Sequence, residues 1–217
     1  MDPPSMPSPM MDEMLVGELL KELGAKGADA MAASLTKLLG KVTIDIQNVF
    51  VADQSSLAGM TSGIDVPVTA NFVPLHGYLD GSLLFVMELD SAELISDILT
   101  MGLGSTNRAL MKISSLKELA NVLTSSVVNV FSDIFSWKIV PMPGIYIMDS
   151  IDSVVAFTSN LPPRVSRESL VINLVIRQQD LETPATLLLM VEEGGIKTLC
   201  QHFFDPFGNA DNAAAPP

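Results

Sequence analysis

Apolar side chains recur along this chain with two periods, one typical of helices and the other of strands. Two long stretches, residues 12–40 and 113–136, carry apolar side chains at helical spacing. Each is followed by β-rich sequence, at residues 42–51 and 138–148. Further strands are predicted at residues 66–73, 77–89, 153–157 and 170–178, and shorter helices at 91–101 and 196–204. The Asp80-Gly81 pair lies between apolar runs, which is a hairpin signal.

The predicted elements follow the same order twice. Lys21-Glu22-Leu23 recurs as Lys117-Glu118-Leu119 at the start of the two long helices, and residues 82–88 are similar to 186–192. The extra residues of the second copy fall in a polar loop at 159–167. We therefore predict an α/β fold, a single pseudo-two-fold domain of two helix-strand-strand-strand-helix repeats whose long helices pack on a continuous β-sheet.

The domain boundaries follow from composition. The domain is expected to span residues 12–205, with repeats at 12–107 and 108–205. Residues 1–11, rich in proline and methionine, and residues 206–217, rich in alanine, asparagine and proline, are expected to be disordered tails.

Composition narrows the possible partners. The 217 residues are 48% hydrophobic and 17% charged, with a net charge of −13, so most of the chain must fold. The mean hydropathy is +0.39, yet no apolar run approaches the length of about 20 residues that spans a bilayer. The 12 basic residues form no cluster, which argues against nucleic acid and anionic membranes. Without a secretory signal at the N-terminus, the expected location is cytoplasmic.

The helix predicted at 113–136 has two distinct faces. Its apolar face would bind it to the sheet, and its opposite face is polar. The polar face consists of Ser114, Glu118, Asn121, Ser125, Asn129 and Ser132, and Ser114 or Ser115 is a candidate N-cap. Solvated helix faces are usually rich in Lys, Glu and Arg, whereas Ser and Asn are weaker helix formers. One interpretation is a neutral docking face that presents one acid and one amide; the other is a solvated face with a chance bias in composition.

The spacing Ser114-x-x-x-Glu118-x-x-Asn121 resembles the signature of the CheC/CheX/FliY group of chemotaxis phosphatases. The resemblance covers roughly residues 12–205, and the sequence departs from it where the family has a proline, a position held here by Gly144. In the first repeat, Glu22 matches the motif, but Glu18 stands where Asp or Ser is usual, Ala25 in place of the amide and Asn48 in place of the proline. The first site is therefore expected to be catalytically dead, although Glu18 and Glu22 remain candidates for partner binding, with Ser114 and Ser125.

The resemblance implies that the chain stimulates loss of phosphate from the aspartyl phosphate of a response regulator such as CheY. The regulator would bring its own Mg²⁺, so no cofactor or metal is expected on this chain. Phosphoryl transfer depends mainly on positioning and charge stabilisation. A neutral amide both donates and accepts hydrogen bonds, so Asn121 is assigned to orienting the attacking water. Glu118 is assigned to pairing with a lysine of the regulator.

Two other readings stay open. The same fold would serve as a non-catalytic adaptor in a chemotaxis array or flagellar switch, or as an unrelated structural or dimerisation domain. Some relatives form dimers and some bind a CheD-like deamidase, so the resemblance adds a homodimer and a deamidase as candidate partners. His76, His202 and Cys200 show no spacing of a metal or nucleophilic site. Asp149 and Asp152 are interpreted as turn residues.

Overall fold

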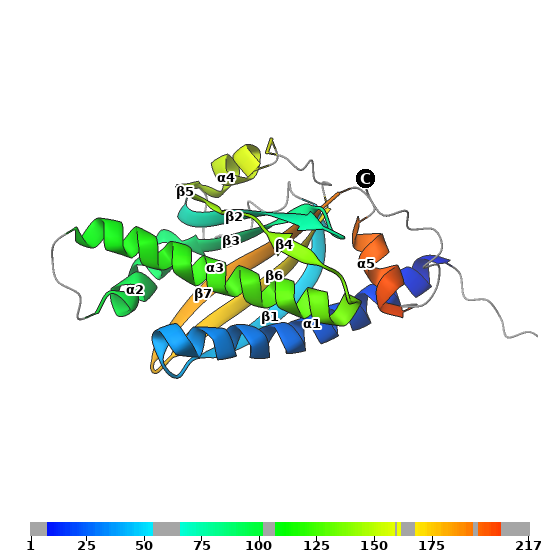
Figure 1. Cartoon of the computed structure of the whole chain (residues 1–217), viewed down its shortest axis with the longest axis horizontal. Coiled ribbons are helices and arrows are strands. Elements are labelled where there is room, and N and C mark those ends of the chain that lie inside the picture. Colours follow the sequence, from blue (N-terminus) through cyan, green and yellow to red (C-terminus); the bar gives the residue numbers. More distant parts are fainter. Residues whose placement is uncertain are drawn as a thin grey trace, which may run out of the picture.

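The computed structural model describes residues 8–53, 66–101, 107–158, 160–161, 168–192 and 195–204 (Figure 1). Within these ranges the chain forms five helices and seven strands. In order they are α1 (Ser8–Leu39), β1 (Thr43–Asp53), β2 (Pro67–Gly77), β3 (Gly81–Glu88), α2 (Leu89–Leu99), α3 (Arg108–Phe135), β4 (Ile139–Pro141), β5 (Ile145–Ser150), α4 (Ile151–Thr158), β6 (Glu168–Gln178), β7 (Leu181–Val191) and α5 (Gly195–Phe204).

All seven strands belong to one antiparallel sheet. The spatial order is β1-β6-β7-β3-β2, and β4 and β5 share the remaining edge of β2. This order is the same from either end when β1 is matched with β4–β5, β6 with β2, and β7 with β3. The pseudo-two-fold axis passes between β3 and β7, where Leu84 lies opposite Leu188. The sheet confirms the predicted α/β class with its two interleaved repeats.

Helices α1 and α3 lie side by side and antiparallel on one face of the sheet (Figure 1). Alternate strand residues point to this face, and they form a continuous core with the apolar sides of the two helices. Leu35 and Leu119 are fully buried there against Leu187 and Leu189. Burying each large side chain stabilises the fold by about 1.5–3 kcal/mol, which fixes α3 on the sheet.

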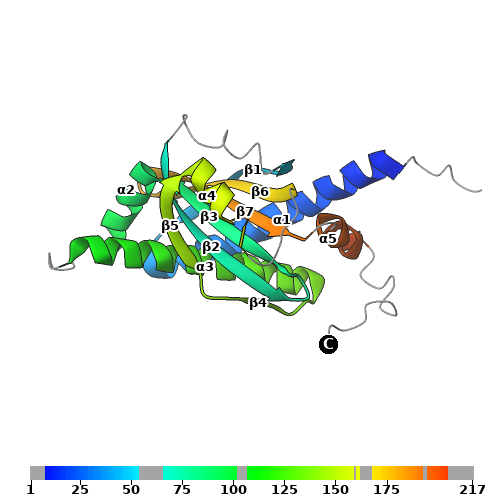
Figure 2. The same cartoon turned by 90° about the horizontal axis from the view of Figure 1, so that it is seen from above.

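Helix α4 lies on the opposite face of the sheet (Figure 2). Its Ile151 and Val154, spaced by three residues, are buried against a second core that includes Phe72, Leu84 and Leu188. The sequence predicted a strand at 153–157, and that prediction is wrong. The Ser150 hydroxyl accepts a hydrogen bond from the Ser153 N–H at 3.3 Å and starts a helix instead, despite the valines that favour strands.

Both long helices begin earlier than predicted. Helix α1 begins at Ser8, within the segment expected to be a tail, and α3 begins at Arg108. Ser114 and Ser115 therefore lie inside α3, and the prediction that either is its N-cap is wrong. Asn107 occupies the N-cap position in a left-handed conformation, with φ of 61° and no side-chain capping bond.

The predicted tail at 206–217 lies outside the described residues, as do residues 1–7 and most of the predicted loop at 159–167. Within the described part of the chain, no helix combines the length and the apolar character needed to cross a membrane.

Candidate functional site on helix α3

Helix α3 presents the predicted polar face to solvent. Glu118 and Asn121 are both exposed, and so are Ser114, Ser125 and Asn129. The intervening positions are buried, with Leu119 at 0% and Leu123 at 0% relative exposure. At about 100° per residue, Glu118 and Asn121 project about 60° apart on the same side of the helix. The acid and the amide are therefore both available to another molecule.

Glu118 is the acid of this face, and none of the ion pairs formed by the described residues includes it. The charged residue before it, Lys117, points toward the edge strand instead. Its Nζ lies 5.7 Å from the centroid of the Tyr146 ring on β5, which is the range of a cation–π contact. Lys117 is thereby drawn to the side of the helix away from Glu118.

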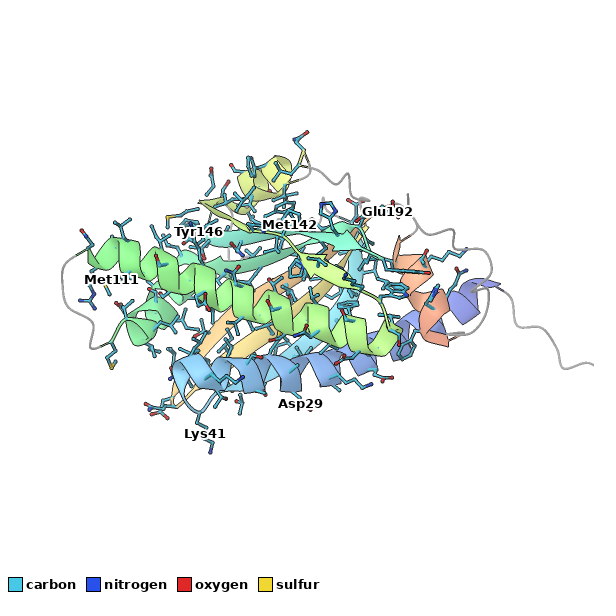
Figure 3. The ribbon with its side chains drawn as sticks, in the orientation of Figure 1. Asp29, Lys41, Met111, Met142, Tyr146 and Glu192 are labelled. Carbon is cyan, nitrogen blue, oxygen red and sulfur yellow. The ribbon has the colours of Figure 1, made fainter. Side chains whose placement is uncertain are left out.

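The ribbon formed by β4, residues 142–144 and β5 runs beside α3 in the opposite direction (Figure 1). The Lys117–Tyr146 contact indicates which parts of the two segments lie near each other. Gly144 precedes Tyr146 by two residues, about 7 Å along the ribbon, and about four or five residues of a helix span the same distance. This spacing puts Gly144 at about the level of Asn121. Figure 3 shows Met142 and Tyr146 along this edge above α3.

The Tyr146 side chain lies between the ribbon and α3. It is half-buried and packs at the margin of the main core. Burial raises the pKa of its hydroxyl, which has no hydrogen-bond partner among the described residues. The phenol is therefore neutral at physiological pH.

Beneath the site, α3 is attached to α1. The Ser126 hydroxyl donates a hydrogen bond to the Ser34 hydroxyl of α1 at 2.8 Å, and it also lies 2.7 Å from the Val122 carbonyl of its own helix. The N-terminal end of α3 is attached to α2, since Asp97 accepts from Lys112 at 2.9 Å and from Arg108 at 3.2 Å. These contacts fix the helix on both sides of Glu118 and Asn121.

The corresponding face of α1, in the first repeat, lacks the pair of an acid and an amide. Glu22 forms an ion pair with Lys26 at 2.5 Å, whereas Val122 stands at the corresponding place in α3. Ala25 occupies the place of Asn121, and it lines a groove of about 690 Å³ between α1 and β1 that also contains Asn48. Glu18 lies within α1, but its side chain is outside the description. The groove marks the pseudo-symmetric counterpart of the α3 site.

The other sequence candidates do not assemble into a site. No group of three His, Cys, Asp or Glu side chains in the described residues is placed to hold a metal ion. His76 lies 3.3 Å from Asp80 in the β2–β3 hairpin, and His202 packs edge-on against Trp137 at 5.0 Å. Asp149 lies within β5, one residue before its end, and Asp152 lies in the first turn of α4, so the two acids are not the turn residues that were predicted. Cys200 lies within α5, and its side chain is outside the description.

Sequence reasoning missed the residues that surround the predicted pair. Lys117 recurs with Lys21 in the repeat, which was a usable signal. Tyr146 and Asn71 carried no such signal, because their relation to α3 depends on the pairing of β2 with β5.

Comparison with known proteins shows similarities in sequence and in fold. No protein-family model matches the chain. The curated protein "CheY-P phosphatase CheC" of Bacillus subtilis is 24% identical over 180 residues, which cover 79% of this chain and 86% of the relative. The chain is therefore similar in sequence to a chemotaxis protein of the CheC/CheX/FliY type.

Solved structures share the fold of this chain. The crystal structure of Thermotoga maritima FliY covers 87% of this chain and 96% of its own, with a TM-score of 0.67 and 18% identity. The middle domain of FliM from a Vibrio species, V. alginolyticus, covers 85% and 99%, with a TM-score of 0.61 and 13% identity. At these identities the two structures show a shared fold. They say nothing about the chemistry of the α3 face.

Proposed function

We propose that this chain stimulates hydrolysis of the aspartyl phosphate of a CheY-like response regulator. The observation that carries the proposal is the exposed pair Glu118 and Asn121 on a rigid helix face. Support comes also from the curated relative, which is named as a phosphatase of phosphorylated CheY. An enzyme of this kind is a protein aspartyl-phosphate phosphatase.

In the proposed reaction, Asn121 orients a water molecule in line with the acyl phosphate. Its carboxamide accepts a hydrogen bond from the water and donates one toward the phosphoryl oxygens. The water oxygen forms the new bond to phosphorus, and the bond from phosphorus to the aspartyl oxygen breaks. The products are the aspartate carboxylate and inorganic phosphate, which keeps the protons of the water. The regulator supplies the Mg²⁺ that offsets the phosphoryl charge.

Glu118 has a docking role in this proposal. It pairs with a lysine in the regulator's phosphorylation pocket and fixes the position of Asn121 above the phosphoryl group. The absence of an ion pair at Glu118 within the described residues leaves its charge available for this contact. The uncharged Ser114, Ser125 and Asn129 reduce repulsion between this acidic chain and an acidic pocket.

The direct test follows label loss from a purified CheY protein phosphorylated with ³²P, with and without this chain. Asn121→Ala is expected to abolish stimulation and to leave binding to beryllofluoride-activated CheY intact. Glu118→Gln, which keeps the shape and removes the charge, is expected to weaken binding at least tenfold. Asn129→Ala is the matched control, because Asn129 is an exposed amide two turns further along the same helix.

A non-catalytic adaptor is the second candidate function. It is favoured by the shared fold with the FliM middle domain, by Gly144 at the motif position and by the altered first repeat. Binding of activated CheY by the wild type without any faster loss of phosphate would establish the adaptor and overturn the phosphatase. A CheD-like deamidase partner and a homodimer stay predictions, and pull-down and sedimentation experiments with purified proteins test them.

A further inference from the structure

Glycine is needed at position 144 because its neighbours leave no room for a side chain. Its backbone conformation does not require glycine. Among the described glycines, only Gly40 and Gly77 have positive φ values. A Cβ atom added to Gly144 would lie 2.9 Å from Nδ2 and 3.0 Å from Oδ1 of Asn71, and 3.1 Å from a methyl carbon of Val73. These distances are at or below the closest approach of a carbon atom to such groups. The Asn71 carboxamide therefore occupies the space that any larger residue at 144 would need.

Asn71 has little freedom to move away. It lies in the middle of β2, between β3 and β5, and is 3% exposed. Its neighbours Ala70 and Phe72 point to the core beneath α4, so Asn71 points to the face covered by α3, beside Tyr146. Within the described residues its Nδ2 has no hydrogen-bond partner. An apolar side chain of similar size would avoid that cost, so the amide is not there for stability.

The contact lies at the edge of the sheet beside α3. Residues 142–144 belong to the ribbon that runs beside this helix, and the Met142 N–H anchors the start of the segment by donating to the Pro74 carbonyl at 2.8 Å. A proline at 144 would fix φ at this point, whereas glycine is the most permissive residue. Something other than residue 144 must then restrict the segment. The Asn71 side chain is in the position to do so, because both of its terminal atoms lie against Gly144.

We propose that Asn71 is a positioning residue that holds the segment Met142–Gly144 against α3 and so keeps the wall beside Asn121 in place. This inference rests on the proposed phosphatase function. Asn71 acts by filling space beneath Gly144, in place of the conformational restraint of a proline. It contacts neither water nor phosphate, and its effect reaches the reaction through the segment alone.

The test uses the full chain with phosphorylated CheY, and it measures the maximal rate of phosphate loss separately from the affinity for beryllofluoride-activated CheY. Asn71→Ala is expected to lower the maximal rate at least fivefold with affinity unchanged within twofold. Asn71→Leu keeps the number of side-chain heavy atoms and removes the unpaired donor. It is expected to keep the rate within twofold of wild type while raising the melting temperature, which separates positioning from stability.

A double variant gives the decisive comparison. Asn71→Ala combined with Gly144→Ala returns a carbon atom to the emptied space, so its rate is expected to exceed that of Asn71→Ala alone. Gly144→Ala by itself is expected to be slower than wild type because of the collision with the carboxamide. Asn173→Ala is the matched control: this asparagine lies on the opposite face of the same sheet, where it accepts from Thr186 at 2.9 Å. Circular dichroism confirms that each variant folds.

Two outcomes overturn the inference while the proposed function stands. One is an Asn71→Ala rate within twofold of wild type when Asn121→Ala is inactive. The other is an additive loss in the double variant. Failure of the proposed function looks different, because the wild-type chain would then bind CheY without accelerating loss of phosphate.

Discussion

The ammonium nitrogen of Lys117 lies 5.7 Å from the centre of the Tyr146 ring, and this contact joins the functional helix to the edge strand beside it. It separates two adjacent opposite charges, because Lys117 faces the strand while Glu118 faces solvent. By the spacing along the two segments, Gly144 comes to about the level of Asn121. The surroundings of the amide therefore include a strand that follows α3 in the sequence.

Replacement of the Tyr146 ring tests this arrangement. In Tyr146→Leu, Lys117 loses its aromatic partner and becomes free to approach Glu118, which competes with docking. Cation–π contacts at exposed sites are worth about 0.5–1 kcal/mol, so a two- to fivefold loss of affinity for activated CheY is expected. Tyr146→Phe keeps the ring and is expected to bind as the wild type does. Equal affinities for the Leu and Phe variants would contradict the role of the ring.

The buried Tyr146 hydroxyl predicts a loss of stability at high pH. Burial raises the pKa of Tyr146 above the ordinary value of 10.0 for a tyrosine, so the folded state holds this proton more tightly than the unfolded state. Its contribution is complete below pH 10 and is lost as the pH rises through the folded pKa. Urea unfolding at pH 8 and pH 11 is expected to show a smaller loss for Tyr146→Phe than for the wild type. An identical loss in both proteins would refute this assignment.

The Asp97 ion pairs predict a loss of stability in acid. The hydrogen bond from Lys112 lowers the pKa of the Asp97 carboxyl below 3.8, and the charge of Arg108 adds to the effect. The folded state therefore favours the ionised form, and its contribution is present above pH 3.8 and is lost as the pH falls through the folded pKa. Asp97→Asn is expected to melt at a lower temperature than wild type at pH 7, and this difference is expected to shrink as the pH falls below 3.8. Glu93→Gln, an exposed change on the same helix, serves as control, and an equal shift in both variants at pH 7 would count against the ion pairs.

Substitutions in the first repeat are predicted to give its helix face the ability to stimulate phosphate loss. In an Asn121→Ala background, Ala25→Asn alone is expected to add little activity, because Glu22 stays paired with Lys26 at 2.5 Å. Adding Lys26→Val, which copies Val122, frees the acid, and a measurable stimulation of phosphate loss is expected. The measurement is label loss from phosphorylated CheY at saturating enzyme. Equal activity of the two variants would show that the ion pair is not what limits this face.

The sequence was informative where local pattern and burial agree. The helical period around Leu119 and Leu123 placed Glu118 and Asn121 on the exposed side, as the structure has them. It failed at the start of α3, where Ser114 and Ser115 were as good N-cap candidates by residue type as Asn107, which makes no side-chain capping bond. It failed again at α4, where Val154 and Val155 favour a strand by propensity, but packing on the free face of the sheet favours a helix.

What the sequence determined by itself was the repeat, the α/β class and the outward direction of the acid and the amide, because each depends on spacing within one element. Only the tertiary structure decided what surrounds them. The contact of Asn71 with Gly144 joins residues 73 positions apart in the chain, and it exists because β2 pairs with β5. Which strands pair depends on how both faces of the sheet pack over the whole domain. The pattern of residues within one element does not contain that information.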